Sequence, residues 1–187
     1  KELKSKDILK NTLIVCLSDH GEDLNGLYKN DKGGKKLGHP EEFGHGCLLY
    51  DQTQKTILIL KDKSLPLNIN IKQQVRLVDV FPTILDLLKI KLKDKNDGVS
   101  LLPIVKNNVN LNLLGYSETF YPEEQTQSTG KFKNAKNKIS YRIANKYKVI
   151  FNLNSDNVEL YDLENDKDEI KNLYKSPYED KTKTLNE

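Results

Sequence analysis

Asp19 and His20 follow the apolar stretch 13–17 after one intervening residue, Ser18, and precede Gly21. An uninterrupted Leu/Ile/Val run of this length is typical of a strand buried on both faces, the central kind in an α/β sheet. Ligands bind beyond the carboxyl ends of such strands, where these two residues stand. A carboxylate oxygen beside an imidazole suits half of a divalent metal site. Adjacent strand residues face opposite ways, so both can serve one ion only if the chain turns, which Gly21 permits.

A second candidate for chemistry is His45, which lies between two glycines that would let the backbone approach a ligand closely. Histidine exchanges protons near neutral pH, so His45 could contact an anion or donate a proton to a leaving alcohol. The alternative is a loop histidine ordered by local hydrogen bonds, and we favour the chemical role. Lys36, in the same glycine-rich loop, could attract an anionic substrate, although a solvated charge is the alternative.

Two further residues of this region are given structural interpretations. Glu22 is interpreted as shaping the turn after His20, with orientation of the His20 ring as its alternative role. His39, which precedes Pro40, is interpreted as a solvated loop histidine.

The bulk composition limits the possible function classes. The chain has 187 residues, and its 30 basic and 27 acidic side chains give a net charge of +3. This near-balance gives no whole-chain argument for binding nucleic acid or a membrane surface. No stretch approaches the ~20 apolar residues that a membrane span needs. Cys16 and Cys47 are too few for a disulfide framework, and Cys16 is expected to be a small core residue.

The hydrophobic pattern predicts short elements separated by long loops. Strands are expected at 12–18 and 56–60, and a helix is expected to begin at Asp79 with Pro82 in its first turn. Residues 21–44 are glycine-rich and charged, which is typical of a long functional loop.

The last third of the chain has a different pattern. Short strands are expected at 139–144, 147–153 and 158–163, joined by turns as an antiparallel meander, and a closing helix at 166–174. Basic and aromatic residues alternate over 131–148, which superficially resembles a nucleic-acid strip. An acidic stretch follows, and its side chains could pair with these basic side chains across strands. A structural or solvated role is therefore preferred.

Four segments, in this order, resemble the C-terminal half of a sulfatase of the alkaline phosphatase superfamily. The first two are 11–22, an apolar strand ending in Ser-Asp-His-Gly-Glu, and 44–50, with Gly-His-Gly followed by Leu-Tyr. The others are 78–103, with Val-Asp-Val-Phe-Pro-Thr, Asp-Gly and Ser-Leu-Leu-Pro, and 159–173, which begins Glu-Leu-Tyr-Asp-Leu. Together they extend over nearly the whole chain, and the ordered set is more specific than any one segment.

The resemblance has departures that bear on the chemistry. Many sulfatases have Lys where this chain has His45. The histidine variant resembles some phosphoryl-transfer relatives, so it leaves open whether the substrate is a sulfate ester or a phosphate ester. Lys167 replaces the usual Pro of the last motif. The family's nucleophile motif, Cys or Ser followed by Pro and Arg, is absent, and neither Cys16 nor Cys47 fits it. That motif and the paired aspartates of the metal site are expected in a missing N-terminal half.

The resemblance implies an α/β fold with part of an alkaline-phosphatase-like central sheet, followed by a small C-terminal antiparallel sheet and helix. Residues 1–115 would be the C-terminal part of the catalytic domain, and 116–187 the antiparallel subdomain. Asp19 and His20 would bind a divalent metal, calcium by resemblance, with manganese or zinc as alternatives because an imidazole is softer than calcium prefers. His45 would be catalytic and substrate-binding, with Lys36 as a further substrate contact.

The activity implied is metal-dependent hydrolysis of a sulfate ester, on a small molecule or a glycan, by a formylglycine nucleophile from the missing half. The chain alone would be inactive and would aggregate, because its apolar strand would lack neighbours. The alternatives are a phosphodiester or phosphonate hydrolase, a phosphoethanolamine transferase, or a non-catalytic relic. Nucleic acid is not an expected partner, and no membrane segment is expected in this piece. The resemblance allows an extracytoplasmic location, which the sequence itself does not indicate.

Overall fold

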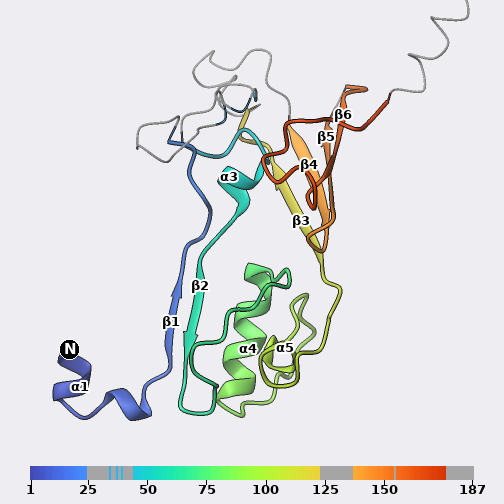
Figure 1. The fold of residues 1–187 in the computed structure, drawn as a ribbon. Helices are drawn as coiled ribbons and strands as arrows, with labels where there is room; N and C mark the ends of the chain where they lie inside the picture. The colour runs from blue at the N-terminus through green and yellow to red at the C-terminus, as the bar shows by residue number, and fades with distance from the viewer. Residues whose placement is uncertain are drawn as a thin grey trace, which may run out of the picture. The chain divides into compact units, whose positions relative to one another are not determined.

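The computed structural model describes residues 1–24, 34, 37, 39, 44–122, 137–153 and 155–175. The chain divides into two compact units, and each is described by itself. The first comprises Lys1–Asp19 and Thr56–Leu113, and the second comprises His20–Lys55 and Leu114–Glu187. Helices and strands occur in both units (Figure 1), so the predicted mixed α/β class is confirmed. The sequence-based division into 1–115 and 116–187 stays a prediction.

The first unit contains a two-stranded antiparallel ribbon, preceded by α1 (Glu2–Ser5) and η1 (Leu9–Asn11). Strand β1 (Ile14–Leu17) pairs with β2 (Leu58–Lys61), as Figure 1 shows. In this pairing Leu17 lies opposite Leu58. Both strands lie where the sequence predicts them. The expected burial on both faces is wrong for this chain, because two strands alone cannot cover their own faces. Leu17 is 45% exposed, and Cys16 is exposed rather than part of the core.

A helix starts where the sequence predicts it, although the reason for its start differs. The 3-10 turn η2 (Leu77–Asp79) runs into α4 (Val80–Leu87). The Asp79 carboxylate does not cap α4. It accepts hydrogen bonds from the backbone N–H of Arg76 and of Val99, both at 3.0 Å, and from the Arg76 guanidinium at 2.7 Å. Asp79 is fully buried, so it ties the start of the helix to a loop 20 residues away.

Thr83 extends this connection by one turn of the helix. Its hydroxyl donates to the Asp79 carbonyl at 2.6 Å and accepts the Leu101 N–H at 2.9 Å. Gly98 is required beside it, because a Cβ there would lie 2.1 Å from the Val78 carbonyl oxygen. The Asp-Gly and Ser-Leu-Leu-Pro segments are therefore structural, and they lead into α5 (Leu102–Asn107), which the sequence analysis did not predict.

The second unit is built on a four-stranded antiparallel sheet in the order β3-β4-β5-β6 (Figure 1). Its strands are β3 (Leu114–Thr119), β4 (Lys138–Ile143), β5 (Tyr147–Asn152) and β6 (Val158–Asp162). The predicted meander is confirmed, and β3 is an added strand. Ile150 on β5 belongs to a buried cluster with Leu49, Tyr50 and Tyr161. The helix α3 (Asp51–Gln54) begins directly after Tyr50 of this cluster.

The predicted helix over 166–174 is wrong, because this stretch forms turns and extended chain. Local bonds take the backbone donors that a helix would use: the Asp166 carboxylate accepts the N–H groups of Ile170 at 3.0 Å and Lys171 at 2.8 Å. Glu169 has a φ of 54° and a side chain that is 2% exposed, bound to Lys148 and to the Asp51 N–H. Burial of this carboxylate therefore decides the local conformation. Among the described helices, none has the length and apolar character to cross a membrane.

Candidate functional site

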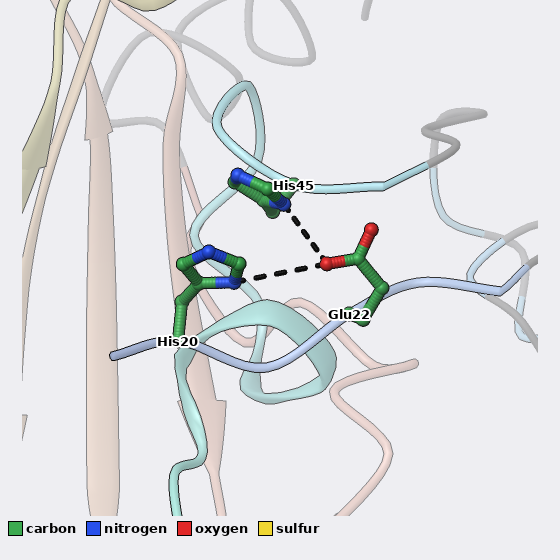
Figure 2. A group of neighbouring side chains, drawn as sticks. All are labelled: His20, Glu22 and His45. Atoms are coloured by element: carbon green, nitrogen blue, oxygen red, sulfur yellow. Dashed lines mark hydrogen bonds and ion pairs between the residues drawn. The ribbon is translucent and has the colours of Figure 1, made fainter. Parts of the chain in front are cut away.

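A short backbone pairing in the second unit brings two of the sequence motifs together. The Asp23 N–H donates to the Gly44 carbonyl and the Gly44 N–H donates to the Asp23 carbonyl, each at 2.8 Å. The segment after His20 thereby lies antiparallel to the segment that carries His45. Figure 2 shows the result: His20, Glu22 and His45 gather at one place.

Glycines are needed on both sides of His45. Gly44 has a φ of +95° and Gly46 a φ of +103°, a region that residues with a Cβ rarely adopt. A Cβ on Gly46 would also lie 3.2 Å from the ring of Tyr121, and the Gly46 carbonyl accepts the Thr119 hydroxyl. The Gly-His-Gly segment is thus held against the end of β3, in a conformation that presents His45.

Gly21 has a different role from the one predicted. It is not among the residues with positive φ. Its N–H donates to the Thr53 carbonyl at 2.9 Å, and a Cβ would lie 2.2 Å from the Gln52 carbonyl oxygen. Glycine is therefore required for close packing against α3, which anchors the segment that carries His20 and Glu22.

The three side chains meet at one carboxylate oxygen. His45 Nδ1 lies 2.9 Å from Glu22 Oε2, which is hydrogen-bond distance, and His20 Nδ1 lies 3.7 Å from the same oxygen (Figure 2). The two imidazole rings stand 3.6 Å apart between centroids, with an angle of 30° between their planes. The side chains of His20, Glu22 and His45 are 36%, 43% and 47% exposed, so a ligand could reach them.

His20 has the hydrogen bonding of a metal ligand. Its Nδ1 lies 2.7 Å from the Gly21 carbonyl oxygen, which can only accept. Nδ1 therefore carries the proton and Nε2 keeps the lone pair that a metal needs. Metal-binding histidines usually donate their other ring N–H in this way. His20 thus fits a divalent cation through Nε2.

One donor atom from each of His20, Glu22 and His45 lies within 4.8 Å of the others. Two imidazoles and a carboxylate are donors that zinc or manganese accepts well, whereas calcium prefers oxygen ligands. The donor set can therefore hold a divalent cation, and it favours the softer ions among those considered.

The structure brings together His20 and His45, but it does not test every predicted site residue. Asp19 is exposed and is the last residue of the first segment of unit one, whereas His20 is the first residue of unit two. Binding of one ion by both residues therefore stays a prediction. Lys36 lies outside the described residues. Whether His45 is catalytic also stays a prediction.

His39 contradicts its interpretation as a solvated loop residue. It is 8% exposed, its ring stacks on Tyr50 with 3.9 Å between centroids, and its Nε2 donates to the Glu169 carbonyl at 2.8 Å. A histidine in a polar, glycine-rich loop gives no sequence signal for such burial. His39 is therefore a structural residue of the second unit.

The sequence analysis did not predict the contact between Glu22 and His45. The i, i+2 spacing of Glu22 from His20 is a signal that was available, because such residues share a face of extended chain. The contact with His45 depends on the pairing of Asp23 with Gly44 and could not be read from spacing.

Comparison with known proteins agrees with the resemblance. Residues 43–187 match the family described as N-sulphoglucosamine sulphohydrolase, C-terminal. Arylsulfatase K from Bos taurus is 26% identical over 187 aligned residues, covering 91% of this chain and 29% of that protein. Arylsulfatase K from Homo sapiens is 25% identical, with the same two coverages. The chain thus spans less than a third of the length of these relatives.

Solved structures confirm the fold. A protein in complex with its substrate D-glucosamine-2-N,6-O-disulfate aligns with a TM-score of 0.64 and 20% identity, over 98% of this chain and 34% of that one. The phosphonate monoester hydrolase from Silicibacter pomeroyi aligns with a TM-score of 0.66 and 21% identity, over 97% and 34%. With the match of its residues 43–187, the chain belongs to the N-sulphoglucosamine sulphohydrolase C-terminal family of sulfatases.

Proposed function

We propose that this chain serves as the C-terminal part of a metal-dependent sulfuric ester hydrolase, whose nucleophile is supplied by polypeptide outside these 187 residues. The observation that carries the proposal is the meeting of His20 and His45, from two separate sulfatase motifs, at one oxygen of Glu22. A structural role alone would not require a half-buried and an exposed imidazole held with 3.6 Å between their ring centroids.

In this proposal Asp19 and His20 hold a divalent cation, with the His20 Nδ1–H fixed by the Gly21 carbonyl. When bound, the cation would polarise the sulfuryl oxygens and neutralise their charge. His45 contacts the anionic group or protonates the leaving alcohol. Family resemblance supports calcium, and the His20 imidazole, a softer ligand than calcium prefers, supports manganese or zinc.

The substrate class that we propose is a sulfated sugar. The support is that one structural neighbour was solved with D-glucosamine-2-N,6-O-disulfate as its substrate, and another is described as a 2-O GAG sulfatase. These neighbours are only 20% and 21% identical to the chain, so the position of the sulfate on the sugar is left to experiment.

The test is hydrolysis by the intact protein of 4-nitrocatechol sulfate and of D-glucosamine-2-N,6-O-disulfate, before and after removal of divalent metal. We expect hydrolysis of a sulfate ester that chelation abolishes and one of calcium, manganese or zinc restores. His45→Ala should lower this activity strongly, whereas Lys63→Ala, at an exposed position, should not. Faster hydrolysis of 4-nitrophenyl phenylphosphonate than of any sulfate ester would overturn the proposal in favour of phosphoryl transfer. No hydrolysis of either class would indicate a non-catalytic relic.

A further inference from the structure

We infer that Glu22 is a positioning residue that sets the orientation and tautomer of His45. This inference rests on the proposed function, because it assigns Glu22 a role in the reaction that His45 serves. Its basis is the hydrogen bond between His45 Nδ1 and Glu22 Oε2, at 2.9 Å (Figure 2).

The chemistry of the two groups fixes which nitrogen faces the reactant. An ionised carboxylate can only accept hydrogen bonds, so Nδ1 of His45 must carry the hydrogen in this contact. Nε2 is then the ring atom that exchanges protons with a ligand, and it donates to an anion or a leaving alcohol once it has taken up a proton. Without the carboxylate, His45 would lose the acceptor that fixes its tautomer, and among the described residues its side chain, 47% exposed, would be held only by the His20 ring.

The backbone holds Glu22 in place from both sides. On one side the Gly21 N–H is bonded to the Thr53 carbonyl, and on the other Asp23 pairs with Gly44 through two backbone bonds. The Asp23 carboxylate is 3% exposed and accepts the Gly34 N–H at 2.8 Å. Glu22 therefore projects from a segment anchored at both neighbours, which limits the positions of its carboxylate.

Glu22 acts on His45 more directly than on His20. The distance from Oε2 is 2.9 Å to His45 Nδ1 and 3.7 Å to His20 Nδ1, and only the first is within hydrogen-bond range. His20 already has the Gly21 carbonyl as the acceptor for its Nδ1–H. The His20 ring packs against one face of the His45 ring, with 3.6 Å between the centroids, and so limits the movement of that ring. Glu22 and His20 thus hold His45 from two directions.

The kinetic test is a double-mutant cycle in the intact protein, with 4-nitrocatechol sulfate as the probe. Glu22→Ala should lower kcat/KM by roughly 10–100-fold, the range found when a carboxylate that orients a metal-binding histidine is removed. Adding Glu22→Ala to His45→Ala should cost nothing further, because Glu22 acts through His45. Glu22→Gln should recover part of the activity, since its amide oxygen can still accept the Nδ1–H. Glu164→Ala, which removes an exposed acid elsewhere, should match the wild type.

Two measurements separate this role from others. Bound metal per protein, measured by mass spectrometry, should be unchanged in Glu22→Ala; loss of metal together with activity would make Glu22 a metal ligand and overturn the inference. Fully additive losses in the double mutant would also overturn it.

The third readout does not need activity. In protein labelled with ¹⁵N-histidine, the ring nitrogens of His45 (assigned by their loss in His45→Ala) should show a fixed Nδ1–H tautomer that Glu22→Ala converts to a mixture. An unchanged spectrum would overturn the inference. If the wild type hydrolyses no sulfate ester, the proposed function fails, and the ring spectrum still decides whether Glu22 orients His45.

Discussion

Lys148 and Glu169 form an ion pair in the interior of the second unit, with 2.7 Å between Nζ and Oε1 and only 2% of each side chain exposed. The same ammonium lies 3.1 Å from Asp51 Oδ1, and the Arg142 guanidinium donates to both oxygens of Asp51. Buried ion pairs of Lys148 therefore join strand β5 to α3 and to the 166–174 segment.

Replacing Lys148 by Met should destabilise the second unit strongly. The substitution keeps a long apolar stem but leaves Glu169 without its cation, and breaking a buried pair in this way costs about 3–5 kcal/mol. Thermal unfolding of the intact protein should show a lower Tm. The exposed Lys63→Met is the control, and equal Tm values for both variants would contradict the prediction.

The contribution of Asp51 to stability should depend on pH. Burial alone would raise the pKa of Asp51, but Lys148, Arg142 and Lys55 together hold it well below its usual range. A lowered pKa means that the stabilisation is complete above the unfolded value of about 4 and is lost as pH falls below it. Burial raises the pKa of Glu169, and that effect has the opposite sign.

The measurement for Asp51 is urea unfolding of the wild type and of Asp51→Asn at pH 6 and pH 3. The difference in unfolding free energy between the two proteins should be larger at pH 6. Asp156→Asn, at an exposed position, should show a difference near zero at both values. A constant difference for Asp51→Asn would show that its charge does not contribute in this way.

Gly46→Ala should impair both stability and catalysis. A φ of +103° is strained for any residue with a Cβ, at roughly 1–3 kcal/mol, and the new methyl group would press on the Tyr121 ring. We expect a lower Tm and a loss of aryl sulfatase activity, because His45 is the residue immediately before Gly46 in the chain. Gly115→Ala, within β3 and not among the residues with positive φ, should change both much less.

Thr83→Ala should lower stability by about 1–3 kcal/mol, because it leaves the buried Leu101 N–H without its acceptor. Thr83→Ser keeps the hydroxyl and should retain most of the stability. Thermal unfolding of the two variants tests this. Equal losses would assign the effect to the methyl group instead of the hydrogen bonds.

The isolated chain should self-associate. Leu17, Ile57 and Ile59 are 45%, 60% and 58% exposed along the β1–β2 ribbon, whose outer edges have no strand partner among the described residues. Light scattering of the 187-residue chain should show oligomers, and Ile59→Lys should reduce them. A monodisperse, cooperatively melting wild-type chain would contradict this prediction.

The sequence predicted elements best where the pattern is local. The meander over 138–162 was predictable from alternating residues and turns, and the helix at Asp79 from its apolar spacing. The prediction of a helix at 166–174 was wrong because Glu169 is buried in an ion pair with Lys148, which lies 21 positions earlier and on another element. β3 was missed because its small residues, such as Gly115, weaken the alternation.

The site shows the same limit. The histidines were identifiable from the glycines and the strand end beside them. Their meeting at Glu22 depends on the backbone pairing of Asp23 with Gly44, for which neither segment carries a local signal. Burial of His39 likewise follows from its stacking on Tyr50, a contact made in the folded state.

The bond between Thr119 and the Gly46 carbonyl, with Tyr121 beside Gly46, has a consequence for how the protein is made. His45 is translated some 70 residues before the side chains that support its neighbour. Until residues 114–121 have left the ribosome, the Gly-His-Gly segment lacks the surface that holds its conformation. A nascent or truncated chain ending at α5 would contain all three histidines and still lack an ordered His45.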